Sequence, residues 1–233
     1  MDTARIAALL EPFLDQPLRE SQLDQISIYI DLLKRWNARI NLTAIRNQEE
    51  IVTRHFGESL FMARHLFPGP SNSESNSESA QAPEGAPSKL RLGGGVRVFD
   101  IGSGAGFPGL PLKIWAPDTN LTLIESNHKK AAFLREVARA LTLTNINVIT
   151  ERAETVAARP DVPRADLVTL RAVERFETIL PPAAALLGQR GRLALLIGAS
   201  QIPQLTTLTN LKWHPPIQVP QSHQRVLSIG ERW

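Results

Sequence analysis

The sequence contains no cysteine among its 233 residues. A disulfide framework and a thiolate metal site are therefore both excluded. Long hydrophobic runs are missing as well, since no apolar stretch approaches the ~20 residues that a membrane-spanning helix needs. The first residues include Asp2, Arg5 and Glu11, and so do not resemble a secretory signal peptide. These absences predict a cytoplasmic protein without a membrane partner.

The excess of positive over negative charge is also small. Lys and Arg number 26 and Asp and Glu number 23, so the formal net charge is +3. Such a balance does not by itself separate a nucleic-acid-binding protein from one that binds none. The hydrophobic fraction of 42% is that of an ordinary globular protein. The length suits one α/β domain with a small N-terminal addition.

The N-terminal third is predicted to be helical. Apolar side chains repeat with the helical period from Leu23 to Ile40, which gives one buried stripe. A second helix is predicted to begin after Asn47, because asparagine is a favoured N-cap and Glu50 follows three residues later. Pro68 is expected to end it. Residues 1–67 are therefore predicted to form an N-terminal helical region.

Residues 68–95 differ in composition from the rest of the chain. The segment is rich in Ser, Asn, Glu, Pro, Gly and Ala and contains the near-repeat SNSE-SNSE. Such a segment cannot bury enough apolar surface to order itself, which predicts a flexible linker. A phosphorylated or partner-binding segment is the alternative. The main domain then comprises residues 96–233.

Strand-like and helical segments alternate in the main domain. This alternation predicts a Rossmann-like α/β fold, in which crossover helices cover a mostly parallel sheet. The predicted strands are 96–101, 121–125, 146–150, 165–170 and 192–198, and the predicted helices are 106–115, 129–140 and 176–187. Two final runs, 211–219 and 224–230, are predicted to form a closing antiparallel hairpin.

A glycine-rich loop follows the first predicted strand. The segment VRVFDIGSGAGFPG covers residues 96–109, and its strand is predicted to end near Asp100. Gly102, Gly104 and Gly106 would let a ligand approach the backbone closely at the carboxyl edge of the sheet. A helix is predicted directly after the loop, and would direct its positive end toward that ligand.

Two cofactor classes use such a loop. Gly104, Gly106 and Gly109 match the dinucleotide-binding spacing, with Glu125 about 20 residues downstream. The alternative is the S-adenosylmethionine loop, in which an acidic residue, here Asp100, precedes G-x-G-x-G. A carboxylate would repel the pyrophosphate of a dinucleotide, whereas it favours the ammonium and sulfonium of S-adenosylmethionine. The sequence therefore favours a methyltransferase over an oxidoreductase or a purely structural glycine turn.

Further candidate residues follow the next two strands. Glu125 is expected to accept hydrogen bonds from the ribose hydroxyls, and the alternative is a solvated carboxylate at a strand end. Ala153 and Glu154 lie where the adenine edge is expected. Glu154 would equally favour a helix dipole, and the sequence does not separate these two roles.

Arg171 is the charged residue expected in the substrate site, at the carboxyl end of the fourth strand. Its guanidinium would stack on the reacting base or bind a phosphate. The alternative is a salt bridge to Glu174 or Glu58. The five histidines are scattered, so no metal site is expected. RNA contacts are expected from basic residues, namely Arg35, Arg39, Arg54, Lys129 and Lys130.

With these residues identified, the chain resembles the small-subunit ribosomal RNA methyltransferase G family, also called glucose-inhibited division protein B. The resemblance runs from about residue 20 to the end, apart from the linker. The most specific matching segments are RWNARINLT (35–43), RHFGESL (54–60), DIGSGAGFPGLP (100–111), ESNHKKAAFL (125–134) and LRAV (170–173).

The resemblance implies a class I methyltransferase fold and methyl transfer to N(7) of one guanine in 16S rRNA. It also implies that S-adenosylmethionine is held by Gly102, Phe107, Ala153, Glu154 and Arg171. The chain departs from the family in its long linker and in Leu170, where Ser is common. N(7) has an exposed lone pair, so no general base, metal or covalent intermediate is expected. The protein is expected to act as a monomer. A non-catalytic RNA-binding assembly factor with a vestigial loop is the remaining alternative.

Overall fold

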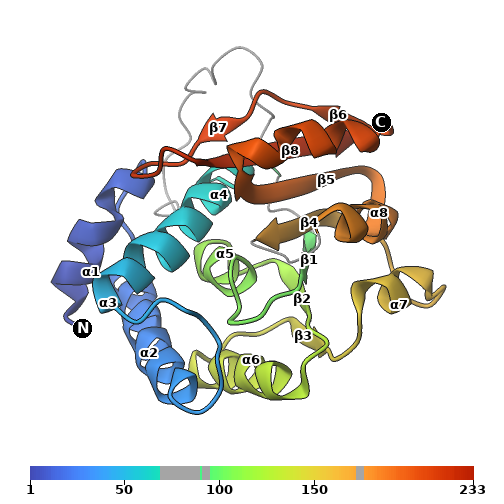
Figure 1. Cartoon of the computed structure of the whole chain (residues 1–233). Coiled ribbons are helices and arrows are strands. Elements are labelled where there is room, and N and C mark those ends of the chain that lie inside the picture. Colours follow the sequence, from blue (N-terminus) through green and yellow to red (C-terminus); the bar gives the residue numbers. More distant parts are fainter. Residues whose placement is uncertain (69–89, 91–94, 172–175) are drawn as a thin grey trace.

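The computed structural model describes residues 1–68, 90, 95–171 and 176–233. Its strands are β1 (Arg97–Ile101), β2 (Asn120–Ile124), β3 (Ile146–Ile149), β4 (Ala165–Arg171), β5 (Leu187–Gly198), β6 (Leu211–Trp213), β7 (Ile217–Gln218) and β8 (Arg225–Arg232). They form one sheet in the order β3-β2-β1-β4-β5-β8-β6, and β7 pairs with β8 (Figure 1). β1 to β5 are parallel, whereas β8 is antiparallel to β5, β6 and β7. The predicted mostly parallel sheet with antiparallel C-terminal strands is confirmed.

Helices occupy the N-terminal region and the connections between parallel strands. The N-terminal elements are α1 (Thr3–Leu10), η1 (Glu11–Phe13), α2 (Glu20–Asn37), α3 (Gln48–Glu50), η2 (Ile51–Gly57) and α4 (Glu58–Leu66). The later ones are α5 (Gly109–Trp115), α6 (His128–Ala140), α7 (Ala153–Ala158), α8 (Phe176–Leu186) and η3 (Ala199–Thr207). No helix among the described residues is long and apolar enough to cross a membrane.

The second N-terminal helix begins as predicted and then changes its winding. The Asn47 side chain accepts hydrogen bonds from the backbone N–H groups of Glu49 (2.9 Å) and Glu50 (3.1 Å), which confirms the N-cap. Directly afterwards η2 is a π-helical turn, and α4 continues the helix to Leu66. The wider turn was not predicted from the sequence. Such insertions are frequent at functional sites.

Three predicted boundaries were wrong. α5 begins at Gly109 rather than Gly106, because Gly106 has a φ of +89°, outside the helical region. β5 begins at Leu187, five residues before the predicted strand. The first run of the predicted hairpin is divided into β6 and β7, since the intervening Pro215–Pro216 pair has no N–H to donate to β8.

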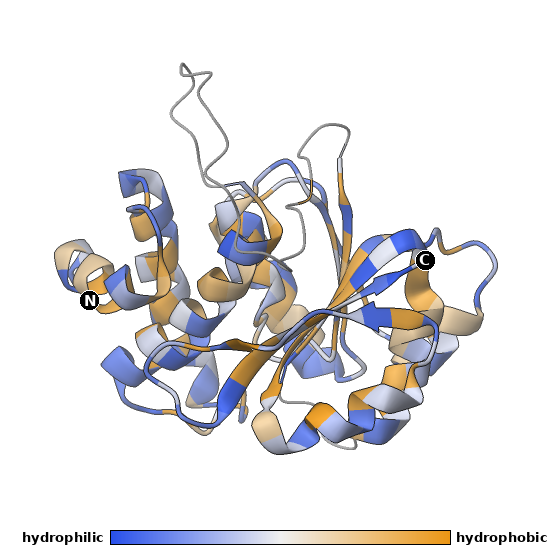
Figure 2. Cartoon of the chain, turned by 90° about the horizontal axis from the view of Figure 1, so that it is seen from above, coloured by the Kyte–Doolittle hydropathy of each residue, from blue (hydrophilic) through white to orange (hydrophobic). Residues whose placement is uncertain are grey.

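Each face of the sheet carries its own hydrophobic cluster, and alternate residues of each strand contribute to opposite faces. Figure 2 shows the mainly hydrophobic central strands with helices on both sides. On one face Val98 and Leu196 pack with α5, α6 and the N-terminal helices. On the other Phe99 and Ile197 pack with α7, α8 and η3. The N-terminal helices therefore share one core with the main domain.

The segment predicted to be a flexible linker, residues 68–95, lies mostly outside the described residues. Of residues 69–94 only Leu90 is described. Its backbone N–H donates to the Leu66 carbonyl at 2.7 Å, and its side chain packs against the cluster of the N-terminal helices.

Candidate functional site

The glycine loop lies at the carboxyl edge of the sheet, between β1 and α5. The backbone N–H groups of Gly102 and Ser103 donate to the Ile124 carbonyl, at 2.9 and 3.2 Å, and so fix the loop against the end of β2. Gly104 has a φ of +54°, a left-handed conformation that glycine adopts without the penalty of a Cβ. The loop conformation therefore depends on glycine, as the sequence pattern indicated.

Glu125 follows β2 and is bonded to the loop. Its Oε2 accepts from the Gly104 N–H at 2.9 Å, and its Oε1 accepts from the Asn127 N–H at 2.7 Å. The residue is 7% exposed. Each carboxylate oxygen has two lone pairs, so each retains the capacity to accept one further hydrogen bond. The carboxylate is therefore oriented by the backbone and still able to bind two hydroxyl groups.

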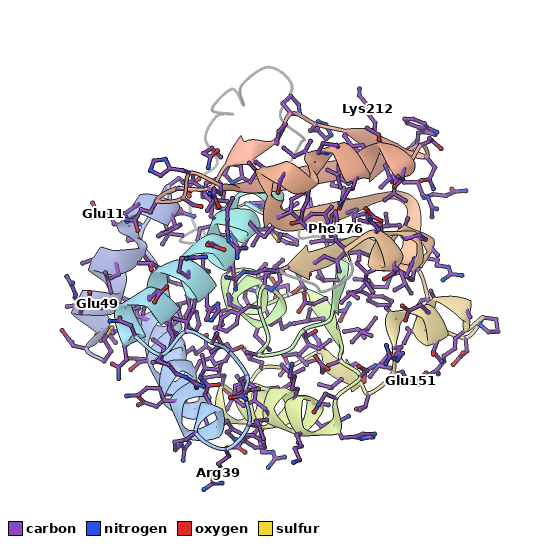
Figure 3. The ribbon with its side chains drawn as sticks, viewed as in Figure 1. Glu11, Arg39, Glu49, Glu151, Phe176 and Lys212 are labelled. Carbon is purple, nitrogen blue, oxygen red and sulfur yellow. The ribbon has the colours of Figure 1, made fainter. Side chains whose placement is uncertain are left out.

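Four of the residues predicted to hold a cofactor line one cleft of about 180 Å³, namely Gly102, Glu125, Ala153 and Glu154. The cleft lies between the carboxyl ends of β1 and β2, the start of α7 and α8. Its lining also contains Glu151, which Figure 3 shows beside the α7 region. Three carboxylates and one guanidinium group, that of Arg152, thus line the cleft, and Glu151 is paired with Arg159 at 2.8 Å. The remaining excess of negative charge favours a cationic ligand over an anionic one.

Asp100 is not on the surface of this cleft. It is fully buried beneath the loop, where its Oδ1 accepts from the Thr169 Oγ1 at 2.8 Å. A Cβ on Gly109 would lie 2.8 Å from the Asp100 Oδ2, so glycine is required there for space. Burial, with a smaller contribution from the charge of Glu125, raises the pKa of Asp100 to about 6. Hydrogen bonds from Thr169, Ser103 and the Gly109 N–H oppose it.

Asp100→Asn should gain stability relative to the wild type as the pH rises from about 4 to about 7. The pKa of Asp100 is about 6 in the folded state and 3.8 ordinarily, so the folded protein binds this proton more tightly than the unfolded chain does. The resulting stabilisation is complete below about pH 4. This contribution is lost as the pH rises through about 6, whereas Asn does not titrate. The difference in unfolding free energy between Asp100→Asn and the wild type, measured by urea denaturation, should therefore change by about 3 kcal/mol across this pH range. A constant difference would contradict the shifted pKa.

Phe107 and Arg171 lie apart from the 180 Å³ cleft. The Phe107 ring is stacked between Tyr29, with centroids 5.3 Å apart, and His55, with centroids 4.7 Å apart. The Arg171 guanidinium carbon is 6.0 Å from the centroid of the same ring. The two residues are therefore close to each other and to the N-terminal helices, on the other side of the glycine loop from Ala153.

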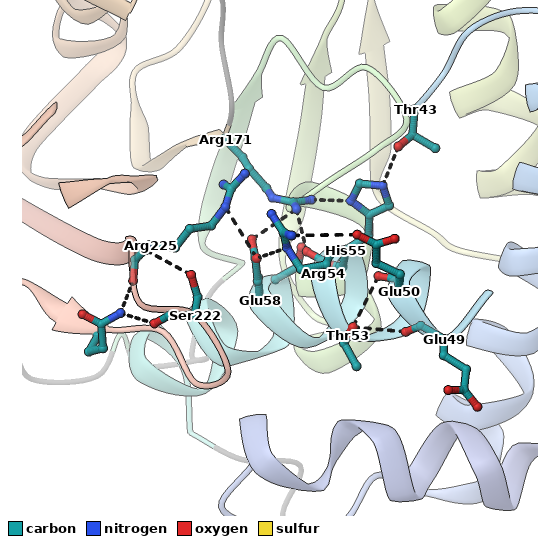
Figure 4. A network of polar contacts seen from close by, with 12 residues as sticks. Thr43, Glu49, Glu50, Thr53, Arg54, His55, Glu58, Arg171, Ser222 and Arg225 are labelled. Carbon is teal, nitrogen blue, oxygen red and sulfur yellow. Dashed lines mark hydrogen bonds and ion pairs between the residues drawn. The ribbon is translucent and has the colours of Figure 1, made fainter. Parts of the chain in front are cut away.

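Arg171 is held by the helix that contains the π-helical turn (Figure 4). Its Nη1 bonds the His55 Nδ1 at 2.9 Å, and its Nη2 donates to the Glu58 Oε2 at 3.1 Å and to the Arg54 carbonyl. The Arg171 side chain is only 6% exposed. The sequence offered Glu58 and Glu174 as alternative salt-bridge partners of Arg171, and the salt bridge to Glu58 is present. The other partner, Glu174, lies outside the described residues.

His55 is a neutral link in this network. Arginine can only donate, so the His55 Nδ1 accepts, and the Nε2–H donates to the Thr43 Oγ1 at 2.8 Å. Burial, together with the charges of Arg171, Arg54 and Arg225, lowers the pKa of His55 to about 3. The imidazole therefore stays neutral, with its single proton on Nε2, and joins Thr43 in the N-terminal region to Arg171.

The basic residues expected to contact RNA are dispersed. Arg39 extends from the end of α2 into solvent (Figure 3). Arg35 is exposed on α2, and Lys129 and Lys130 lie in the first turn of α6. Only Arg54 joins the network around Arg171, through its ion pair with Glu58.

Sequence reasoning missed three residues of this region. Tyr29 was assigned only to a buried stripe, Arg225 was assigned to nothing, and Glu58 was named only as an alternative partner. A signal existed for Glu58, because Arg54 and Glu58 have the (i, i+4) spacing of a helical ion pair. Tyr29 and Arg225 reach the site through contacts distant in sequence, for which no local signal exists.

Tyr29 connects α2 to the glycine loop, since its hydroxyl donates to the Ala105 carbonyl. Tyr29→Phe keeps the ring stacked on Phe107 and removes only that bond. We expect the affinity for a ligand of the loop to fall about 5-fold, as for one buried hydrogen bond, measured by calorimetry. The matched control is Gln22→Met, which removes the 2.8 Å bond from the same helix to the Ile114 carbonyl. Equal affinities in both variants would exclude a role of Tyr29 in positioning the loop.

Comparison with known proteins gives a consistent result. The model of the family described as rRNA small subunit methyltransferase G matches residues 22–71 and 89–222. The proteins named ribosomal RNA small subunit methyltransferase G include one from Roseiflexus castenholzii, 41% identical over 70% of this chain and 59% of its own length. Another, from Xylella fastidiosa, is 35% identical over 86% of this chain and 84% of its own length. The chain spans about three fifths of the length of the Roseiflexus and Chloroflexus relatives.

Two solved structures share the fold at low sequence identity. The fibrillarin/Nop5p complex has a TM-score of 0.52 and 17% identity, covering 64% of this chain and 77% of that chain. TYW2 of P. horikoshii, solved in complex with MeSAdo, has a TM-score of 0.52 and 14% identity, covering 76% and 62%. With the strand order of the sheet, these likenesses confirm the predicted Rossmann-like, class I methyltransferase fold.

Proposed function

Because the chain belongs to the rRNA small subunit methyltransferase G family, we propose that it transfers a methyl group from S-adenosylmethionine to N(7) of a guanine in 16S rRNA. The observation that carries this proposal is the cleft with an excess of negative charge beside the glycine loop. Gly102, Glu125, Ala153 and Glu154 meet there, although they come from different elements of the fold. Such a constellation fits a cationic adenosine derivative and disfavours the pyrophosphate of a dinucleotide.

The residues present fit this cofactor. Glu125 has two oriented oxygens for the two ribose hydroxyls, and each already accepts one backbone hydrogen bond. Ala153 and Glu154 begin α7 beside it, where the adenine would lie. Gly102 and Gly104 leave backbone access along the loop. Asp100 would act on the cofactor's positive charges from beneath the loop, rather than by facing the cleft.

Arg171 would complete the site on the substrate side, next to Phe107, which the resemblance assigns to the cofactor. Phe107 is fixed between two aromatic rings, and Arg171 is fixed by Glu58 and His55. Bound S-adenosylmethionine supplies the methyl group: its bond to sulfur breaks as a bond to N(7) forms, and the positive charge moves to the guanine. The chain's own contribution is orientation of the two reactants, which accounts for large rate effects without any proton transfer.

The proposal has a direct test in two steps. S-Adenosylhomocysteine should bind the purified protein in calorimetry, and NAD should not. The protein should then transfer a labelled methyl group to small-subunit rRNA, and the product should be 7-methylguanosine at a single position. Binding of NAD alone would favour an oxidoreductase, whereas cofactor binding without methyl transfer to RNA would favour a non-catalytic assembly factor.

The setting of this activity follows from the substrate. An enzyme acting on 16S rRNA works in the bacterial cytoplasm, with the small ribosomal subunit or its RNA as partner. We propose that the protein acts there as a monomer, which light scattering of the free protein would test.

A further inference from the structure

A second cleft, of about 510 Å³, lies at the same edge of the sheet as the first. Its walls are the last residues of β5, Gln201 and the segment before β8. β8 runs antiparallel to β5, and Arg225, its first residue, pairs with Gly198, the last residue of β5. This pairing brings Arg225 to the carboxyl edge, where open α/β sheets bind their ligands. Arg54 forms the side of the cleft nearest the N-terminal helices.

This second cleft borders an excess of positive charge (Figure 4). The carboxylate of Glu58, 1% exposed, is 3.0 Å from the Arg54 Nε, 3.1 Å from the Arg171 Nη2 and 3.6 Å from the Arg225 Nε. One negative charge cannot neutralise three positive ones. Glu50 is 3.9 Å from Arg54, but both side chains are more than 40% exposed, so solvent screens that pair.

Two of the three guanidinium groups reach the cleft. The Arg54 and Arg225 side chains are 42% and 23% exposed, whereas Arg171 is 6% exposed. Among the described residues, no hydrogen bond engages the two terminal nitrogens of Arg225. Glu58 thus orients both guanidinium groups through their Nε atoms and leaves terminal N–H groups facing the cleft. Such N–H groups are suited to donate charge-assisted hydrogen bonds to a phosphate.

The two clefts are electrostatic opposites. The first has three carboxylates in its lining, Glu125, Glu151 and Glu154, against the single arginine Arg152, and lies next to the carboxyl ends of β1 and β2. The second is lined by Arg54 and Arg225, next to the end of β5. β4 lies between these halves of the sheet and ends at Arg171. A cationic cofactor and a polyanionic substrate would therefore approach from opposite sides of Arg171.

We propose that Arg54 and Arg225 form a phosphate-binding site that holds the backbone of the RNA substrate beside Arg171. The inference rests on the proposed function, because it takes the polyanion to be the RNA that is methylated. Phosphate contacts of this kind set the position of an RNA without reading its sequence. The site would place the target guanine beside Arg171, with the cofactor on the far side.

The main test compares two arginine variants of equal charge change. Arg225→Gln alters the cleft, and Arg97→Gln alters the opposite, amino edge of the sheet, where Arg97 is 45% exposed. Binding of in vitro transcribed small-subunit rRNA is measured by filter binding at several salt concentrations. Arg225→Gln should weaken binding about 10-fold and reduce the slope of log K against log salt by about 0.7. Arg97→Gln should bind as the wild type does.

A second pair of variants avoids the Glu58 cluster, in case Arg225→Gln unfolds. His223→Glu adds a negative charge to the cleft from an exposed position, and Asn210→Glu adds one in the exposed turn before β6. Only the first should weaken RNA binding. The proposed phosphate site would be overturned if the cleft variant and its control bind RNA equally in both pairs, or if the wild type does not bind the RNA.

Cofactor binding separates this inference from the proposed function. Arg225→Gln should bind S-adenosylhomocysteine with wild-type affinity, because Arg225 does not line the cofactor cleft. If the wild type binds RNA through Arg225 but neither binds the cofactor nor methylates RNA, the phosphate site stands and the enzyme activity does not. If methylation proceeds and Arg225→Gln retains full RNA affinity, the activity stands and the phosphate site does not.

Discussion

Gly104→Val should lower the affinity for S-adenosylhomocysteine by about 100-fold or more. The residue has a φ of +54°, where a β-branched side chain adds about 1–3 kcal/mol of backbone strain. Relief of that strain would move the Gly104 N–H away from Glu125, which it holds at 2.9 Å. The two branches of valine would in addition project from the loop into the space that the cofactor needs.

A graded series separates the two causes. A Cβ at position 104 meets nothing closer than the Gly102 carbonyl at 3.7 Å, so Gly104→Ala tests the backbone conformation alone and should lower affinity less than valine does. Gly188→Ala, at a glycine without positive φ in β5, is the control and should bind normally. Calorimetry on the three variants measures these affinities. Near-normal affinity of Gly104→Val would show that the loop is not the cofactor site.

Arg171→Ala should destabilise the protein and remove most of its methyl transfer. The substitution leaves the His55 Nδ1 without its donor and takes one of three cations from the buried Glu58 carboxylate. Breaking a buried ion pair costs about 3–5 kcal/mol, and the lower end applies because Arg54 still contacts Glu58. Arg171→Lys should recover only part of the loss, since a single ammonium cannot reach His55, Glu58 and the Arg54 carbonyl together.

Three measurements on the same variants identify what Arg171 does. Urea denaturation gives stability, calorimetry gives cofactor affinity, and single-turnover methylation at saturating cofactor gives the rate below the unfolding temperature. If methyl transfer is lost while cofactor affinity is retained, Arg171 contacts the RNA base. If cofactor affinity is lost, Arg171 contacts the cofactor. A lost stability with a wild-type rate leaves it as a structural cation. Arg159→Ala, which breaks two exposed ion pairs, is the control and should change stability far less.

Most of the fold was predictable from local patterns in the sequence. The alternation of apolar runs predicts crossover connections and hence a parallel sheet. Asn47 indicates a helix start because its side chain caps the next turn, an interaction of residues two and three apart. The glycines from Gly102 to Gly106 likewise indicate the turn that they form, although hydrogen bonds to Ile124 and Glu125 at the end of β2 hold that turn in place.

The strand order and the substrate side of the site depend on contacts that local patterns do not contain. The sequence indicated two C-terminal runs, but not that β8 would lie between β5 and β6 and so bring Arg225 to the carboxyl edge. Arg171 meets His55 across 116 positions and Glu58 across 113. The carboxylate of Asp100 is turned under the loop because Gly109 leaves room for it there.

The sequence by itself thus determined the elements, the glycine loop and the carboxyl edge at which a ligand binds. Tertiary packing alone decided which side chains meet beside that edge. The physical reason is the range of the interactions. Hydrogen bonds within a turn and the periodic burial of one face act over a few neighbouring residues. The ion pairs of Glu58 with Arg171 and Arg225, and the stack of Tyr29, Phe107 and His55, form only when the N-terminal helices pack against the sheet.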